Sequence, residues 1–125
     1  MTTAEHALKN RAISFLRLAG SGNVRDAYER YVGLGFRHHN AFFPGDRESL
    51  MKAMEENAAK NPDKVLDVAL QDGNYVAVHS QVRQNAHDRG AAVVHIFRFD
   101  DERIVELWDL GQAIPQDSPN RHCMF

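Results

Sequence analysis

The sequence is poor in residues that cross-link or stiffen a chain. It has one cysteine, Cys123, and four prolines among 125 residues. A single cysteine cannot form an internal disulfide, so stability must come from a packed core, as is usual in a reducing compartment. The first residues, Met1-Thr2-Thr3, are not a basic segment followed by an apolar one, so we expect no signal peptide and a cytoplasmic location.

Long apolar runs and an excess of charge of one sign are lacking as well. No window approaches the about 20 apolar residues that a membrane-spanning helix needs. The 15 basic and 17 acidic residues are interspersed and give a formal net charge of −2, unlike the basic surface of a nucleic-acid-binding protein. We therefore expect neither a nucleic-acid partner nor a membrane partner.

The chain does contain enough apolar material for one domain. With 43% hydrophobic residues, positions 1–125 fit a single domain with a modest core. Apolar residues recur with helical spacing over about 2–19, 23–33 and 46–61, and each segment begins with a good capping residue. The interrupted segment 35–44 is expected to be a brief strand or an extended loop.

The second half of the chain has the pattern of a β-meander. Apolar and polar residues alternate, and the hairpin turn signal Asp72-Gly73 joins the first two strands. Helices followed by a meander predict an α+β fold with the helices packed on one face of a curved sheet. The strands are predicted over 66–70, 75–79, 91–99 and 104–110, followed by an irregular tail of about 112–125.

Two ionisable side chains, His95 and Asp109, lie among apolar positions of the last two strands. Because side chains alternate across a strand, each shares a face with hydrophobic neighbours. If the connecting loop holds an odd number of residues, the two lie opposite or diagonal to each other on one face. The same register places Arg98 near Glu106 on the reverse face, and an even loop would break both pairings.

A carboxyl group and an imidazole in an apolar pocket suit acid/base chemistry. Desolvation raises the pKa of a carboxyl group and a neighbouring imidazolium lowers it, and these opposed effects favour a general base that works near neutral pH. Asp109 and His95 are therefore the first candidate catalytic residues. The alternative is an ordinary contact that only satisfies two polar groups.

The other histidines are weaker candidates. His38 and His39 are adjacent, so at most one of them faces a pocket, and the neighbours of His79 leave its face undecided. No HExxH or comparable ligand spacing occurs in the sequence, so we expect no metal. No serine elbow, P-loop or dinucleotide-binding glycine pattern occurs either, so we expect no cofactor.

Four segments together resemble a known family: Gly90–Asp109, His39-Asn40, Phe43–Arg47 and the tail 118–125. In order and spacing they resemble the SnoaL-like branch of the NTF2-like superfamily, and within it the small predicted SnoaL-like aldol-condensation enzymes. The resemblance covers nearly the whole chain. It implies an NTF2-like, cone-shaped α+β barrel in which a strongly curved, mainly antiparallel sheet wraps a helix. It also implies a homodimer formed through the outer sheet face, which includes Trp108.

Polyketide cyclases of this group close a ring by aldol condensation without a metal or an organic cofactor. By resemblance, Asp109 matches their acid/base aspartate, and His39 matches a histidine that follows the second helix. His95 takes a pocket-facing strand position. Relatives often carry an acidic residue at the position of His95 and a histidine at that of Gln81, so the chain departs from the pattern at both.

The leading hypothesis is a small-molecule lyase, isomerase or cyclase that acts on a carbonyl compound. Asp109 would remove a proton beside the carbonyl, and His95 would orient Asp109. His39 or His79 would donate a hydrogen bond to the enolate oxygen. The second hypothesis is a non-catalytic module that binds a small ligand in the same pocket, because a fold does not fix a function. The side chains expected to line the pocket are His79, Phe97, Leu107 and Phe42.

Overall fold

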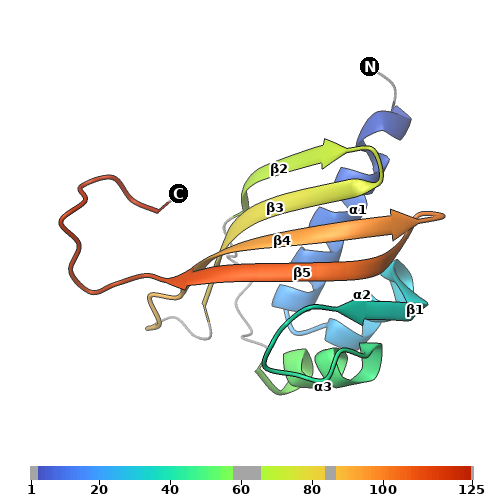
Figure 1. Cartoon of the computed structure of the whole chain (residues 1–125), viewed down its shortest axis with the longest axis horizontal. Helices are drawn as coiled ribbons and strands as arrows, with labels where there is room; N and C mark the ends of the chain where they lie inside the picture. Colours follow the sequence, from blue (N-terminus) through green and yellow to red (C-terminus); the bar gives the residue numbers. More distant parts are fainter. Residues whose placement is uncertain (1–2, 58–65, 84–86, 125) are drawn as a thin grey trace.

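The computed structural model describes residues 3–57, 66–83 and 87–124. A curved sheet of five strands is covered on one face by helices (Figure 1). We call this covered side the inner face of the sheet and the opposite side the outer face. The elements in chain order are α1 (Thr3–Gly20), α2 (Val24–Tyr31), β1 (Val32–His38), α3 (Arg47–Asn57), β2 (Leu66–Asp72), β3 (Tyr75–Val82), β4 (Ala91–Asp100) and β5 (Arg103–Ala113).

The order of the strands across the sheet is β1-β5-β4-β3-β2. β1 runs parallel to β5, and the other neighbours are antiparallel. The predicted α+β class and the curved, mainly antiparallel sheet are therefore confirmed. The sheet is nevertheless open, with β1 and β2 at its two edges, so the expected barrel is not closed.

The helices begin where their capping residues predict. The Asp46 carboxylate accepts hydrogen bonds from the backbone N–H of Ser49 at 2.9 Å and from its hydroxyl at 2.7 Å, which satisfies the first turn of α3. The same bonds lower the pKa of Asp46. Asn23 precedes α2 as expected, but its side chain donates to the Ser21 hydroxyl instead of capping the helix. The predicted end of the third helix, Asn61-Pro62, lies outside the described residues.

The core lies between α1, α2 and the inner face of the sheet. Four aromatic rings meet edge to face: Phe15 is 5.5 Å from Tyr28 and 5.8 Å from Phe97, and Tyr28 is 6.0 Å from Phe36. Such edge-to-face contacts add about 0.5–1.5 kcal/mol each beyond the area buried. The middle of the inner face is therefore filled by side chains. The polar side chains His95 and Asp109 lie on the same face, toward the end of the sheet at which β1 ends.

The hairpin between β4 and β5 reaches the predicted register by an unpredicted route. Its turn holds two residues, Asp101 and Glu102, with φ of +49° and +65°. An even loop was expected to break the pairings, but Val105 forms a bulge between the pairs Phe99–Ile104 and Arg98–Glu106. The extra residue restores the parity of the strand. The pairs His95–Asp109 and Arg98–Glu106 therefore both form.

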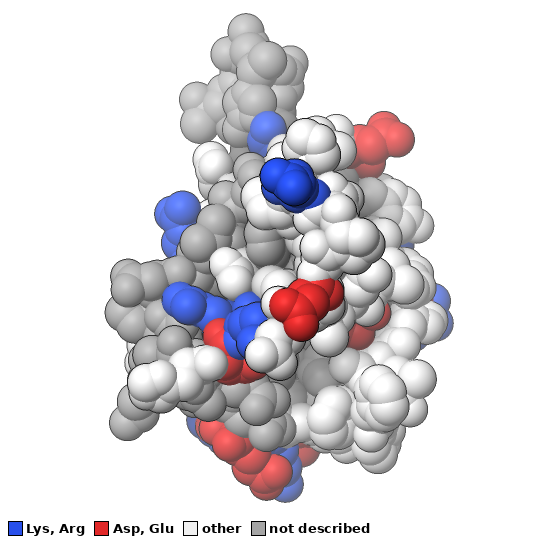
Figure 2. Space-filling view, turned by 90° about the vertical axis from the view of Figure 1, so that its left-hand side faces the viewer, with Lys and Arg blue, Asp and Glu red and all other residues white. Residues whose placement is uncertain are grey.

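The distribution of surface charge and the apolarity of the helices both agree with the composition. On the side of the molecule shown in Figure 2, acidic and basic residues are interspersed with uncharged ones and form no continuous patch of one sign among the described residues. None of the helices in the described ranges combines the length and apolarity needed to cross a membrane.

Candidate active site

Asp109 and His95 occupy directly opposed positions on the inner face of β5 and β4. Their strand neighbours on that face, Leu107 and Phe97, are buried in the core. The His95 ring stacks along the strand on Phe97, with 6.1 Å between the ring centroids and 16° between the planes. Both polar side chains are half-buried, so they lie where the apolar core gives way to a more open region.

Asn40 is the side chain that holds Asp109. Its Nδ2 donates to Asp109 Oδ2 at 3.0 Å, while its Oδ1 accepts from the backbone N–H of Phe42 at 3.0 Å. Because both ends of the amide are fixed, the orientation of the Asp109 carboxylate is fixed as well. No further hydrogen bond to Asp109 comes from the described residues. No local pattern predicts this contact, which joins positions 69 apart through the parallel pairing of β1 and β5.

His38 is a structural residue on the same side of β1. Its ring is buried and stacks near Phe36, and its Nε2 lies 2.6 Å from the Pro44 carbonyl. Its Nδ1 accepts the backbone N–H of Asn40 at 3.1 Å. These two bonds together require a neutral ring with the proton on Nε2. His38 thereby fixes the loop that carries Asn40.

His39 and His79, the two expected enolate donors, do not lie on the face of Asp109. The His39 ring stacks on Trp108 of the outer face, with 4.8 Å between centroids and 2° between planes. His79 pairs with Val94 and also belongs to the outer face. The adjacent histidines His38 and His39 do point to opposite sides, as alternation along the chain predicts.

Glu106 is a buried carboxylate at the centre of the outer face near β1. Only 4% of the residue is exposed, and it accepts hydrogen bonds from Arg37 at 2.9 and 3.3 Å and from Arg98 at 2.9 Å. His39 Nε2 lies 2.6 Å from the same carboxylate. The Arg37 bonds, then those from His39 and Arg98, lower the pKa of Glu106 to about 2 against the opposing effect of burial. The pairing with Arg98 was predicted, whereas Arg37 and His39 were not.

The remaining predicted pocket residues take different places. Phe97 and Leu107 are core residues at 0% and 3% exposure, so they border the site from beneath. Phe42 is 89% exposed on the loop after β1 and lines no enclosed pocket. Tyr28, which the sequence did not single out, is buried behind the site with its hydroxyl 3.1 Å from the sulfur of Met54. Burial raises the pKa of Tyr28, Arg47 lowers it, and the nearby charge of Asp109 raises it further.

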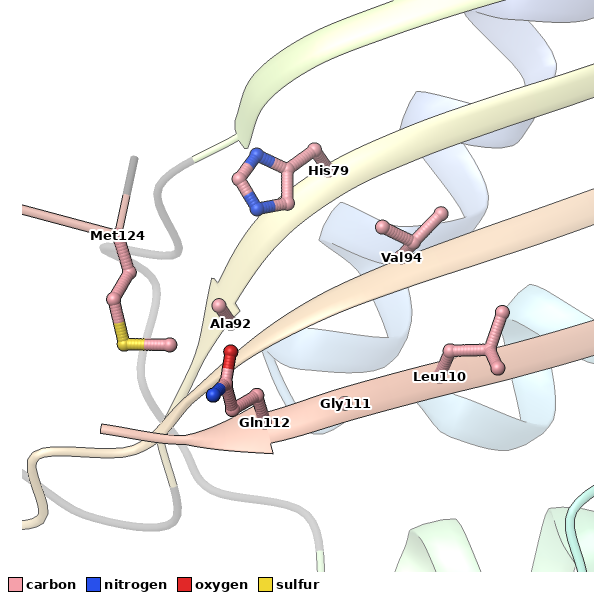
Figure 3. Close-up of a pocket in the computed structure, with 7 residues that line it drawn as sticks. All are labelled: His79, Ala92, Val94, Leu110, Gly111, Gln112 and Met124. Atoms are coloured by element: carbon pink, nitrogen blue, oxygen red, sulfur yellow. The ribbon is translucent and has the colours of Figure 1, made fainter. Parts of the chain in front are cut away.

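A hollow of about 420 Å³ lies on the outer face, away from Asp109 and His95 (Figure 3). The side chain of Met124, from the C-terminal tail, reaches it beside Gln112 and Ala92. None of the described residues that line this hollow carries a side-chain carboxylate. Its lining residues are His79, Ala92, Val94, Leu110, Gly111, Gln112 and Met124. Nowhere in the described ranges do three His, Cys, Asp or Glu side chains gather as metal ligands would.

Comparisons with known proteins identify the fold. No family model matches the chain, and no curated protein matches it in sequence. Among solved structures, it is similar to an NTF2-like protein of unknown function from Burkholderia xenovorans LB400, with a TM-score of 0.75, 14% identity, and coverage of 92% of this chain and 89% of that one.

Two further solved structures have stated activities. One is a proposed SnoaL-like polyketide cyclase from Jannaschia sp. CCS1, with a TM-score of 0.63, 17% identity, and coverage of 89% of both chains. The other is a proposed hydroxylase from Streptomyces galilaeus, with a TM-score of 0.66, 16% identity, and coverage of 91% of this chain and 83% of that one. At such identities the similarity concerns the fold alone. The chain has the NTF2-like fold.

Proposed function

We propose that the chain is a cofactor-independent acid/base enzyme of the SnoaL-like type, acting on a small carbonyl compound as a cyclase, isomerase or lyase. The observation that carries this proposal is the constellation on the inner face: Asp109, held by the Asn40 amide and facing His95 across the hairpin. In this setting one oxygen of the carboxylate is held by a hydrogen-bond donor, and the surroundings of the carboxylate are partly apolar. Both features suit a general base.

In the proposed step, Asp109 takes a proton from the carbon beside the substrate carbonyl. The electrons of the broken C–H bond move to the carbonyl oxygen and form an enolate. His95 donates a hydrogen bond to that oxygen, since it is the imidazole on the same face as Asp109. In a cyclase or in the reverse of a lyase reaction, the enolate carbon then attacks a second carbonyl carbon, whose oxygen takes up a proton. In an isomerase the proton returns to a different carbon.

This assignment moves the donor role from His39 and His79 to His95. His39 bonds Glu106 and stacks on Trp108, both on the outer face. Its proposed contribution is therefore to the structure around Asn40 and not to the enolate.

The experiment is exchange of α-protons for deuterium in a panel of ketones and 1,3-dicarbonyl compounds, followed by NMR in D₂O. Wild-type protein should accelerate exchange for some members, and Asp109→Asn should reduce the rate at least about 100-fold, the usual contribution of a general base. Asp100→Asn, which alters an exposed carboxylate on β4, is the matched control and should exchange at the wild-type rate. Wild-type exchange rates in Asp109→Asn would exclude Asp109 as the base.

A non-catalytic ligand-binding module is the second candidate, and the hollow of about 420 Å³ on the outer face favours it, because it offers room for a small ligand away from Asp109. Such a module would bind members of the same panel without exchanging their protons. Ligand-induced thermal stabilisation that is equal in wild type and Asp109→Asn, with no exchange in either, would select this candidate.

We also propose that the protein is a homodimer formed through the outer face of the sheet. Exposed apolar side chains on this face come from β2, β3 and β5, and Trp108 lies beside them, partly covered by His39 and Tyr75. An apolar sheet face of this kind is usually covered, and a two-fold axis covers it with a second copy. The exposed apolar residues of the outer face are Val68, Leu70, Tyr75 and Leu110.

Sedimentation or light scattering tests the dimer. Wild type should have twice the chain mass, and Leu70→Asp or Leu110→Asp should give monomers. Leu34→Asp is the control, because Leu34 is 91% exposed on β1 at the edge of the sheet. A monomeric wild type would exclude the dimer.

A further inference from the structure

The end of β1 joins the two faces of the sheet. His39 and Asn40 are consecutive, yet His39 binds Glu106 on the outer face and Asn40 binds Asp109 on the inner face. Both partners belong to β5, three residues apart. The segment directly after β1 and the strand β5 therefore each contribute one residue to each face, and the peptide between His39 and Asn40 connects the outer pair to the inner pair.

On the outer face, the His39 ring is fixed in two directions. Its Nε2 is 2.6 Å from the Glu106 carboxylate, and its plane lies flat against Trp108 at 4.8 Å. Glu106 is itself held by Arg37 and Arg98. A carboxylate that is 4% exposed requires such partners, because an unpaired buried charge is costly. The outer cluster, which we define as Glu106, Arg37, Arg98, His39 and Trp108, is therefore a rigid anchor for the end of β1.

On the inner face, the position of Asn40 decides whether its amide reaches Asp109. The contact is one hydrogen bond of 3.0 Å. The peptide plane is rigid and consecutive Cα atoms are about 3.8 Å apart, so a movement of His39 is passed on to Asn40. A shift of about 1 Å would take the amide out of hydrogen-bonding range of the carboxylate.

We propose that His39 and Glu106 are positioning residues for Asp109 that act through Asn40. The outer cluster anchors the end of β1 to β5 and so sets the Asn40 amide against the Asp109 carboxylate. The effect on turnover rests on the proposed function, whereas the geometric link between the two faces does not.

The fold itself has other supports at this point. The backbone N–H of His39 donates to the Leu107 carbonyl at 3.0 Å, and that of His38 donates to the Gly45 carbonyl at 3.1 Å. Variants that remove only the outer side-chain contacts should therefore remain folded. What they should lose is the precise placement of Asn40.

NMR of the Asn40 side-chain amide tests the link without a substrate. Asn40→Ala assigns the signal, and Asp109→Ala gives its position when the contact is lost. His39→Ala and Glu106→Gln should move the signal toward the Asp109→Ala position, while the circular dichroism spectrum stays unchanged. His39→Gln, which keeps a donor toward Glu106, should restore most of the wild-type position.

The matched control is Glu55→Gln. Glu55 forms an exposed ion pair with Arg25 at 2.9 Å between α3 and α2, so its loss should leave the Asn40 signal in place. A wild-type Asn40 signal in both His39→Ala and Glu106→Gln would overturn the proposal. So would a failure of His39→Gln to differ from His39→Ala.

Turnover measurements separate this proposal from the proposed function. With an exchanging ketone, His39→Ala should lower kcat about 10- to 100-fold with little change in KM, as expected for a misplaced catalytic group. If Asp109→Asn is inactive and His39→Ala retains the wild-type kcat, the positioning role fails and the general base stands. If His39→Ala displaces the Asn40 signal and Asp109→Asn remains active, the link between the faces stands and the general base fails.

Discussion

At the scale of single residues, the buried hydroxyl of Ser80 lowers the free energy of unfolding. Ser80 on β3 is 0% exposed, and its Oγ has no hydrogen-bond partner in the part of the chain that is described. A buried polar group without a partner costs about 1–3 kcal/mol. It faces the core on the inner side, directly opposite Val93 of β4.

We expect Ser80→Ala to stabilise the protein by about 1 kcal/mol, because the lost hydroxyl made no compensating bond. Ser21→Ala is the matched control, since the Ser21 hydroxyl donates to the Leu18 carbonyl at 2.8 Å and accepts from Asn23 at 2.9 Å. That variant should be destabilised. Urea denaturation of both variants measures the two changes, and a loss of stability in Ser80→Ala would contradict the prediction.

Glu106 should make stability depend on acid pH. Its pKa falls from an ordinary 4.5 in the unfolded chain to about 2 in the folded protein. As the pH falls below 4.5, the unfolded chain takes up a proton that the folded protein does not, so stability decreases until the pH reaches about 2. Above 4.5 the contribution is fully present.

Glu106→Gln should therefore lose about 2–3 kcal/mol at pH 7, the value of hydrogen bonds to a charged group. The difference from wild type should shrink as the pH is lowered from 5 to 2, measured by urea denaturation at each pH. Glu55→Gln should differ little from wild type throughout, since exposed ion pairs contribute little. A constant difference between Glu106→Gln and wild type would contradict the assigned pKa.

Which of these residues the sequence could predict depends on distance along the chain. Strand alternation and a local hairpin with an odd loop predict the pairs Arg98–Glu106 and His95–Asp109, and these pairs form although the turn is even, because the bulge at Val105 restores the register. The bonds from Asn40 to Asp109 and from His39 to Glu106 instead require β1 to lie beside β5, which no local turn signal indicates. Alternation predicts that His38 and His39 face opposite sides, but it does not say which of them faces Asp109; the contacts of the two rings place His38 on the inner side and His39 on the outer side.

At the scale of elements, the β4–β5 hairpin determines the site. Its two-residue turn has positive φ at Asp101 and Glu102, a conformation that favours Asn-Gly. The turn and the bulge at Val105 together give the register that sets His95 opposite Asp109. The sequence predicted both strands but not the bulge, because a bulge depends on how the strand bends over the core and not on the alternation pattern.

Glu102→Gly should stabilise the protein by about 0.5–1 kcal/mol, since glycine adopts φ of +65° without steric cost. The Glu102 carbonyl, which accepts from Arg11 at 2.7 Å, is kept in the variant. Gly90→Ala provides the opposite case: its φ is +82° and a Cβ there would lie 2.2 Å from the Val82 carbonyl oxygen. Thermal denaturation should show a higher Tm for the first variant and a clearly lower one for the second.

At the scale of the whole molecule, the helices and strands were predictable and the arrangement of the edges was not. The three helices and the four meander strands follow from periodicity and turn residues, each within a few positions of its observed bounds. The placement of β1 at the edge beside β5, and the opening of the sheet between β1 and β2, follow from packing between distant segments. Such packing leaves no periodic trace in the sequence.

The C-terminal tail follows β5 and belongs to no helix or strand of the described chain. After Ile114, whose N–H donates to the Gly90 carbonyl at 3.0 Å, the chain leaves the sheet and turns back toward it (Figure 1). Two hydrogen bonds within the described tail are local, from the backbone of Asn120 to Ser118 and from that of His122 to Asn120. From 115 to 124, Met124 is the one residue that is half-buried while the others are exposed, and it lines part of the outer hollow.

Removal of residues 115–125 should therefore cost little folding free energy. A fully buried methionine contributes about 1.5–3 kcal/mol, so a half-buried Met124 accounts for about 1 kcal/mol. The single variant Met124→Ser should reproduce most of this loss in urea denaturation, because Met124 is the most buried side chain between 115 and 124. A truncated protein much less stable than Met124→Ser would mean that the tail supports the fold through more than this one contact. Equal values would identify Met124 as the residue by which the tail is held to the sheet.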